Sequence, residues 1–255
     1  TDALEYEDAL NNFESINQML SDVAGIESAF NWKDISNMGM KCMPQALFNP
    51  YEGMLNSGML NEVVSDKAHQ LGIVPLYGMD IQQIQSIGNA YQLIDSNGMS
   101  LSCHQLIVAT NAFTKLLLPE LDIVPARGQI ILTKPLENLP FDGIFHSDKG
   151  YIYFRNIDNR ILLGGARNHF EEQEQTFEFK GEDNIKEYLI RYLSEVVLPG
   201  QKFEIETSWA GIMAMGKEKI PIVKRVNDNL ILCVRMSGMG VALGPVLSDE
   251  VLQML

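Results

Sequence analysis

Cysteine is scarce in this sequence and is never clustered. The 255 residues include three cysteines, Cys42, Cys103 and Cys233, which lie far apart and form no CxxC pair. An odd number of isolated cysteines indicates neither a disulfide framework nor a zinc site. The four histidines are equally scattered, so we expect no bound metal. Unbridged thiols are typical of a reducing compartment, and we therefore expect a cytoplasmic protein.

The sequence also has few basic residues and no long apolar run. Lysine and arginine total 19 against 33 acidic residues, which gives a net charge of −14. A chain this acidic repels phosphate backbones, so nucleic acid is not an expected partner. No apolar run approaches the roughly 18 residues that suggest a membrane span. The 46% of hydrophobic and 20% of charged residues are typical of a globular protein with a proper core.

Apolar residues recur at helical spacing over residues 3–24, 57–72 and 182–197, and they predict a helix in each of these segments. Residues 37–50 are rich in Met, Pro and Asn and are expected to be irregular. Short β-branched runs predict strands at 73–77, 81–85, 91–95, 106–110, 129–133, 151–155, 160–163, 202–209 and 230–234. Because the run at 106–110 is continuously apolar, we expect it to be buried on both faces of an α/β sheet.

A glycine-rich turn follows the apolar run at 230–234. Gly238, Gly240 and Gly244 precede a short amphipathic stretch, and strand, glycine turn and helix together are the usual form of a phosphate or dinucleotide site. The spacing is GxGxxxG rather than GxGxxG, and no further βαβ unit follows. The alternative is a helix that packs tightly on its strand, so the turn alone does not decide between the two.

Several degenerate motifs agree in order along almost the whole chain. They are Tyr51–Asn56, Val108–Phe113, Pro125–Gln129, Tyr151–Arg155 with Arg160–Gly165, and Trp209–Gly211 with Pro221–Val223 and the glycine turn. Together they resemble the FAD-dependent oxidoreductases of the D-amino-acid oxidase and glycine oxidase (DAO) family.

The resemblance implies a mixed α/β fold with two interleaved lobes. We expect a partial FAD-binding, Rossmann-like lobe at 46–118 and 217–255, and an antiparallel-sheet substrate lobe at 1–45 and 119–216. The family's opening βαβ unit with GxGxxG is not found in this sequence. We therefore expect the chain to be the C-terminal part of the enzyme, inactive alone and prone to lose FAD. Uncovered sheet edge and apolar surface would favour a partner chain, such as a homo-oligomer.

The resemblance also assigns roles to residues at matching positions. Tyr151 lies where relatives place a substrate-facing tyrosine, and Arg155 and Met213 belong to the same implied substrate site. The implied contacts with FAD fall on Ile81 for adenine, on Ala109, Thr110 and Asn111 for the adenosine diphosphate, and on Gly238, Met239, Gly240 and Val241 for the flavin pyrimidine. Backbone N–H groups at the last four positions would stabilise negative charge on the reduced flavin.

One departure from the family concerns the substrate carboxylate. Glycine-oxidase relatives place an arginine after the W-x-G stretch, where this sequence has Met213, and methionine cannot pair with a carboxylate. Either Arg155, Arg167 or Arg235 supplies the clamp, or the substrate has no carboxylate there. Relatives that bind flavin covalently use a cysteine in this stretch, whereas residues 209–220 contain none, so we expect non-covalent FAD.

The leading functional prediction is flavin-dependent oxidation of an amine or amino acid to an imine. No general base is assigned, because a neutral amine does not require one, and His146 is expected to be structural. One alternative is oxidation of a 2-hydroxy acid on the same fold, which would need a base such as a histidine. Another is a non-catalytic remnant whose antiparallel sheet serves as an interaction surface.

Overall fold

The computed structural model describes residues 3–255, which group into two compact units. Unit 1 contains the described part of Thr1–Leu60, with Gln129–Phe170 and Lys180–Ala210. Unit 2 contains Asn61–Gly128, Glu171–Phe179 and Gly211–Leu255. The chain passes between the units several times, so both are assembled from segments distant in sequence.

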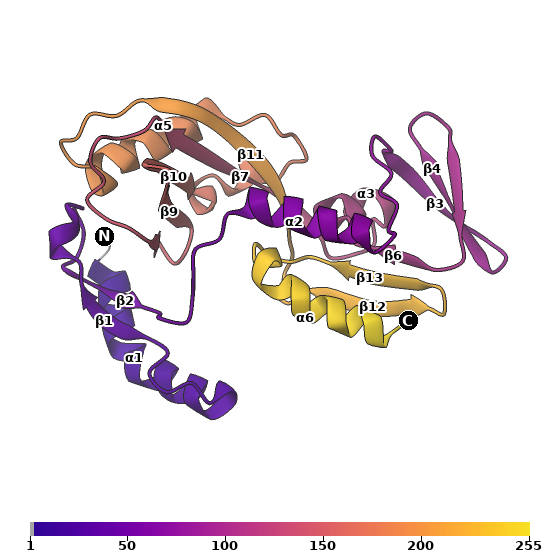
Figure 1. Ribbon diagram of the computed structural model, residues 1–255, viewed down its shortest axis with the longest axis horizontal. Coiled ribbons are helices and arrows are strands. Elements are labelled where there is room, and N and C mark those ends of the chain that lie inside the picture. The colour runs from indigo at the N-terminus through magenta and orange to yellow at the C-terminus, as the bar shows by residue number, and fades with distance from the viewer. Residues whose placement is uncertain (1–2) are drawn as a thin grey trace. The chain divides into compact units, whose positions relative to one another are not determined.

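A five-stranded sheet in the order β11-β7-β10-β9-β8 is the centre of unit 1 (Figure 1). Its strands are β7 (Val124–Thr133), β8 (Ile144–Ser147), β9 (Ile152–Ile157), β10 (Arg160–Gly165) and β11 (Ile205–Met215). The pairs β8–β9, β9–β10 and β10–β7 are antiparallel. Asp158 and Asn159 have φ values of 47° and 58°, the left-handed conformation required by the tight β9–β10 hairpin that the sequence predicts.

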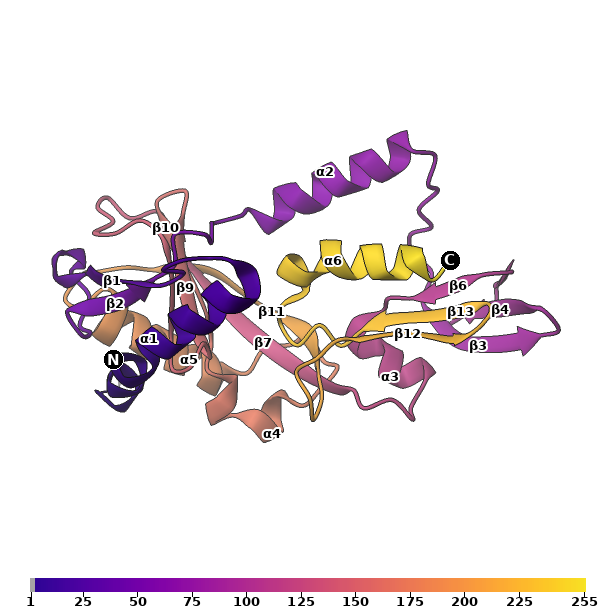
Figure 2. The same ribbon diagram turned by 90° about the horizontal axis from the view of Figure 1, so that it is seen from below.

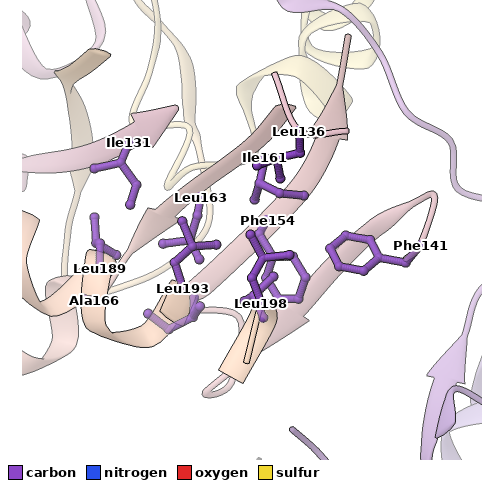
Figure 3. Packing of buried hydrophobic residues seen from close by; sticks show 12 residues of the cluster. Ile131, Leu136, Phe141, Phe154, Ile161, Leu163, Ala166, Leu189, Leu193 and Leu198 are labelled. Carbon is purple, nitrogen blue, oxygen red and sulfur yellow. The ribbon is translucent and has the colours of Figure 1, made fainter. Parts of the chain in front are cut away.

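One face of this sheet is covered by α5 (Asp183–Tyr192) and the π-helical turn η4 (Leu193–Val197). Leu189 and Leu193 are fully buried against Phe154 and Leu163 of the sheet (Figure 3). Burying each such side chain contributes about 1.5–3 kcal/mol. Since side chains alternate along a strand, Tyr153 and Arg155 of β9 point to the opposite face.

The N-terminal part of unit 1 packs around Trp32. Helix α1 (Ala3–Ala24) places the rings of Tyr6 and Phe13 with their centroids 5.4 and 5.7 Å from the Trp32 ring. Trp32 lies in β1 (Asn31–Asp34), which is followed by the 3-10 turn η1 (Ser36–Met38) and pairs with β2 (Gln45–Phe48). The expectation that 37–50 is irregular was therefore wrong for β2, because pairing with β1 orders this stretch.

The mixed sheet of unit 2 has the order β12-β13-β6. Strand β13 (Leu230–Val234) is antiparallel to β12 (Ile222–Asn227) and parallel to β6 (Leu106–Val108). Helix α6 (Gly240–Gln253) runs beside β12 and β13 (Figure 2). Ile107 is 42% exposed, so the expectation of burial on both faces was wrong for this residue.

The remaining elements of unit 2 are a second sheet and several helices. A second sheet contains β3 (Ile81–Ile87), β4 (Ala90–Asp95) and β5 (Ser100–Cys103), and short helices follow at η2 (Asn111–Phe113), α3 (Thr114–Leu117) and α4 (Glu171–Glu174). Helix α2 (Ser57–Gln70) ends where Gly72, at φ 83°, allows the Ile73 N–H to bond the Ala68 carbonyl. The strand predicted at 73–77 was wrong, because within residues 3–255 no strand pairs with that segment.

A buried ion pair holds α4 on β7. The Arg127 guanidinium contacts the Glu174 carboxylate at 2.7 Å, and both side chains are 1% exposed. Arg127 also donates to the carbonyl of Gln173. Charges this deeply buried persist only because they are paired and hydrogen-bonded.

Candidate functional site

The carboxyl ends of the parallel strands β6 and β13 meet in unit 2. Ala109 and Thr110 directly follow β6, and Asn111 adopts a left-handed φ of 46°. The Asn111 side-chain oxygen accepts a hydrogen bond from the Met236 backbone N–H at 3.3 Å, which joins the two strand ends. Ligands of open α/β sheets bind at the carboxyl ends of the strands, so this junction is a candidate cofactor site.

The turn after β13 has an unusual backbone. Arg235, Ser237 and Gly238 have φ values of 61°, 50° and 85°, a region that costs non-glycine residues roughly 1–2 kcal/mol each. Arg235 is buried, and its guanidinium bonds the carboxylate of Asp122 at 2.8 Å and the carbonyl of Ile220 at 2.9 and 3.0 Å. These bonds hold the strained turn in place.

Helix α6 begins with free donors. Its N-cap is Met239, and among residues 3–255 no side chain caps it. The first backbone N–H groups of a helix, here those of Gly240, Val241 and Ala242, have no partner within the helix and mark its positive end. The Ser237 hydroxyl oxygen is also buried without a hydrogen-bond partner in the described range. The turn therefore presents several unused polar groups together.

Met213 lies beside this turn. Its sulfur is 3.8 Å from the position that a Cβ at Gly238 would occupy, so the structure brings together two residues that the sequence had separately assigned to substrate and cofactor. Cys233 is on the strand that enters the turn, and burial raises the pKa of its thiol. A raised pKa keeps this thiol protonated and weakly nucleophilic.

Ile81 lies in a different part of unit 2. It begins β3 in the β3-β4-β5 sheet and is paired with Asp95, whereas Asn111 and Gly238 lie at the end of the β12-β13-β6 sheet. The predicted contact of Ile81 with adenine therefore lies on a different sheet from the glycine turn. This contact stays a prediction.

Two tyrosines are held in unit 1 by consecutive glycines. A Cβ at Gly164 would lie 2.8 Å from a ring carbon of Tyr153, and a Cβ at Gly165 would lie 1.8 Å from the carbonyl oxygen of Tyr151. Burial raises the pKa of the Tyr153 phenol, and the His146 ring lies beside it at 6.5 Å between centroids. Tyr153 was not among the predicted site residues, although its two-residue spacing from Tyr151 could have revealed it.

Arg155 and Arg167 differ in their contacts. Arg155 donates to the carbonyl of Leu55 at 2.6 Å. The Arg167 guanidinium lies over the Tyr151 ring, 5.6 Å from its centroid. Tyr151 therefore has Arg167 as its cationic neighbour, a pairing that sequence spacing does not reveal.

The described residues offer neither a metal-binding cluster nor a membrane-spanning helix. In the described range, no group of three or more His, Cys, Asp or Glu side chains could hold a metal ion. Among the helices of residues 3–255, none combines the length and apolar character needed to span a bilayer.

Comparisons with known proteins agree with this architecture. A family model described as FAD dependent oxidoreductase (DAO) matches residues 4–254. No curated protein matches at a significant level. The solved L-proline dehydrogenase from P. horikoshii is similar, with a TM-score of 0.74 and 16% identity over 96% of this chain and 67% of that one.

Further solved structures show the same fold. Glycine oxidase from Geobacillus kaustophilus has a TM-score of 0.74 and 14% identity over 96% of this chain and 76% of that one. L-Amino acid deaminase from Proteus myxofaciens, solved with anthranilate, has a TM-score of 0.76 and 15% identity, covering 98% and 70%.

Proposed function

Since this chain belongs to the DAO family of FAD-dependent oxidoreductases, we propose that it oxidises an amine or amino acid at the carbon that carries the nitrogen. The family match makes the chain an oxidoreductase with FAD as its cofactor. The solved relatives are named for proline, glycine and L-amino acids. An amino group next to a carboxylate is common to those compounds, and it is the substrate feature that we propose for this chain.

The observation that carries the proposal is the uncapped N-terminus of α6 at the carboxyl ends of β6 and β13. The free N–H groups of Gly240 and Val241 can donate to the flavin pyrimidine carbonyls, with Gly238 and Met239 at the same edge. The partnerless Ser237 hydroxyl fits a polar ligand at this turn. The described residues therefore fit a flavin.

The other cofactor contacts follow from the same placement. Ala109, Thr110 and Asn111, at the end of β6, would lie near the adenosine diphosphate, and Ile81 near the adenine. In this proposal residues 46–118 and 217–255 form the FAD lobe, and residues 1–45 and 119–216 form the substrate lobe. In this proposal the protein holds FAD without a covalent bond.

Bound FAD supplies the two-electron acceptor, and the protein's residues bind and orient the substrate. In this proposal Tyr151 and Arg155 of unit 1 would offer polar contacts to the substrate. Met213 of unit 2, beside the glycine turn, would supply an adaptable apolar contact. Correct orientation of the reacting carbon is itself a large part of catalysis. A neutral amine needs no base, and we assign none.

The test uses the purified full-length gene product with FAD bound. Its visible absorption spectrum reports the flavin, and bleaching under anaerobic conditions reports substrate oxidation. We expect bleaching with members of an amine and amino-acid panel and none with 2-hydroxy acids. Bleaching by 2-hydroxy acids alone would replace this proposal with the hydroxy-acid alternative. A flavin that no panel member reduces would contradict both.

Met239→Asp should separate helix stability from cofactor binding. An acidic side chain at the N-terminus of α6 interacts favourably with the helix dipole, so the free energy of unfolding without FAD should stay level or rise by about 0.3–1 kcal/mol. The same carboxylate competes with the flavin carbonyls for the N–H groups of the first helical turn. We expect the FAD dissociation constant to rise about 5- to 30-fold, equivalent to ~1–2 kcal/mol.

Met239→Asn is the matched control, because asparagine has nearly the same shape as aspartate but carries no charge. Calorimetric FAD titration and thermal unfolding of both variants give the two quantities. Equal FAD affinity in Met239→Asp and Met239→Asn would show that the α6 N-terminus does not hold the flavin.

A further inference from the structure

Unit 1 contains a cavity that is lined by none of the residues predicted to contact substrate or FAD. Its volume is about 330 Å³, and its lining comes from α1, the β1–β2 hairpin, β8, β9 and the end of α5 with η4. A cavity of roughly 150 Å³ holds benzene, and small-molecule sites begin at roughly 300 Å³. The volume therefore fits a molecule of two fused rings.

Two pairs of aromatic rings line this cavity. The rings of Tyr6 and Trp32 meet edge to face, with their centroids 5.4 Å apart. The rings of Phe145 and Phe154 are stacked, with 5.0 Å between centroids and 10° between planes. Aromatic side chains favour an aromatic ligand through stacked and edge-to-face contacts. Met43 also lines the cavity, and its flexible thioether can adapt to the shape of a ligand.

The charged groups around the cavity favour a neutral ligand. Among residues 3–255, no lysine or arginine lines it, Glu5 is its one acidic side chain, and His146 is exposed to solvent. The Glu5 carboxylate accepts hydrogen bonds from the backbone N–H groups of Asp148 at 3.0 Å and Lys149 at 2.6 Å. An anion would meet this carboxylate with no lysine or arginine to offset it. A cation would have to compete with the two N–H groups, so an uncharged ligand is accommodated best.

A hydroxyl acceptor is available in the lining. The Ser147 hydroxyl shares a hydrogen bond of 2.6 Å with the Tyr192 hydroxyl, and both residues line the cavity. A hydroxyl oxygen has two acceptor lone pairs. Whichever of the two groups donates, the Ser147 oxygen keeps at least one lone pair for a ligand. A ligand with its own O–H group can therefore be oriented at this end of the cavity.

Hydrogen bonds between distant segments hold the cavity open in a fixed shape. The Lys41 N–H donates to the Val196 carbonyl at 2.8 Å, which ties the segment between β1 and β2 to η4. The Asn17 side chain of α1 donates to the Phe30 carbonyl at 2.9 Å and accepts from the Phe30 N–H at 2.8 Å. Because the surrounding elements are already ordered, a ligand loses less affinity to ordering them.

We propose that this cavity is a binding site for a neutral aromatic compound of two fused rings that carries a hydroxyl group. The size, the aromatic lining, the charge distribution and the Ser147 acceptor all point to this class of ligand. The inference is independent of the proposed oxidation, because every lining residue belongs to unit 1 and none is assigned to substrate or FAD.

The test measures how fast N-ethylmaleimide alkylates Cys42 in the FAD-bound, full-length gene product. Cys42 lines the cavity as a free thiol, so a ligand in the cavity shields it. The probe is 2-naphthol, at about ten times the dissociation constant that calorimetry gives. We expect Cys42 labelling to slow roughly 10-fold, because only the unoccupied fraction reacts. Peptide mass spectrometry distinguishes Cys42 from Cys103 and Cys233, whose labelling should not change.

A charged probe of the same shape tests the preference for a neutral ligand. In 2-naphthoate a carboxylate replaces the hydroxyl group of 2-naphthol on the same two rings. Its charge is unfavourable beside the Glu5 carboxylate. At equal concentrations we expect 2-naphthoate to leave Cys42 labelling close to its rate without ligand.

Ala9→Phe tests the location of the site from the α1 side. Ala9 lines the cavity, and a phenyl ring there occupies space that the ligand needs, so the dissociation constant of 2-naphthol should rise roughly 10-fold or more. Ala24→Phe is the matched control, because Ala24 is an exposed residue of the same helix outside the cavity lining. It should bind 2-naphthol as the parent does. Thermal unfolding and the flavin spectrum show that each variant is folded.

Three results would overturn the proposal. The first is unchanged Cys42 labelling in the parent protein with 2-naphthol, and this measurement decides even if Ala9→Phe does not fold. The second is equal affinity of Ala9→Phe and Ala24→Phe for 2-naphthol, which would place its binding elsewhere. The third is equal protection of Cys42 by 2-naphthoate and 2-naphthol, which would contradict the selection of a neutral ligand.

Discussion

Gly165→Ala is expected to destabilise the protein by about 2–5 kcal/mol and to impair substrate binding. At φ 118° an alanine is strained whatever the space around it, which accounts for roughly 1–2 kcal/mol. The added Cβ would also lie 1.8 Å from the Tyr151 carbonyl oxygen, and relieving such overpacking costs a further ~1–3 kcal/mol. Because backbone must move, Tyr151 and Arg167 would shift with it.

Gly200→Ala is the control for this prediction. Gly200 also has a positive φ, 77°, but a Cβ there meets nothing within 4 Å. It should therefore show the conformational cost of roughly 1–2 kcal/mol alone. Chemical denaturation gives both values, and steady-state kinetics gives the effect on kcat/KM. Equal losses of stability in the two variants would contradict the steric argument.

Arg127→Met is expected to lower the free energy of unfolding by about 3–5 kcal/mol, because it takes the guanidinium away from a carboxylate buried at Glu174. A domain is stable by only roughly 5–15 kcal/mol, so the midpoint of thermal unfolding should fall sharply. The double variant Arg127→Met with Glu174→Gln should recover part of the loss, since the buried charge is then neutralised.

The surface pair Lys134–Glu204 provides the comparison. Its side chains are 56% and 73% exposed, and ion pairs in solvent contribute little. Lys134→Met should leave the denaturation midpoint nearly unchanged. If it costs as much as Arg127→Met, burial is not what makes the Arg127–Glu174 pair important.

Strong local patterns were sufficient for many elements of the fold. Helical periodicity predicted α1, α2 and α5 with η4, and the hairpin between β9 and β10 followed from its turn residues. The prediction that 37–50 is irregular and the prediction of a strand at 73–77 were wrong for the same reason. A strand exists only when another strand pairs with it, and pairing is not encoded in a short window.

The family, the cofactor and the class of enzyme were predicted from motifs in the sequence, and the family match confirms them. The assignments of individual site residues stay predictions. The structure adds contacts between these site residues that their spacing in the sequence could not show. It joins Asn111 to Met236, it sets Met213 beside Gly238, and it puts Arg167 on Tyr151.

By itself, the sequence determined the helices, the hairpin, the glycine turn and the family, because each depends on residue type at short spacing. Only the tertiary structure decided which arginine is free. The sequence does not distinguish the three arginines Arg155, Arg167 and Arg235. Whether each guanidinium has a hydrogen-bond partner depends on residues far away in the chain. Asp122 and Ile220 occupy Arg235, and Leu55 occupies part of Arg155. Hydrogen bonds over such separations form only after folding brings their groups together, and within residues 3–255 the Arg167 guanidinium has only the Tyr151 ring as its partner.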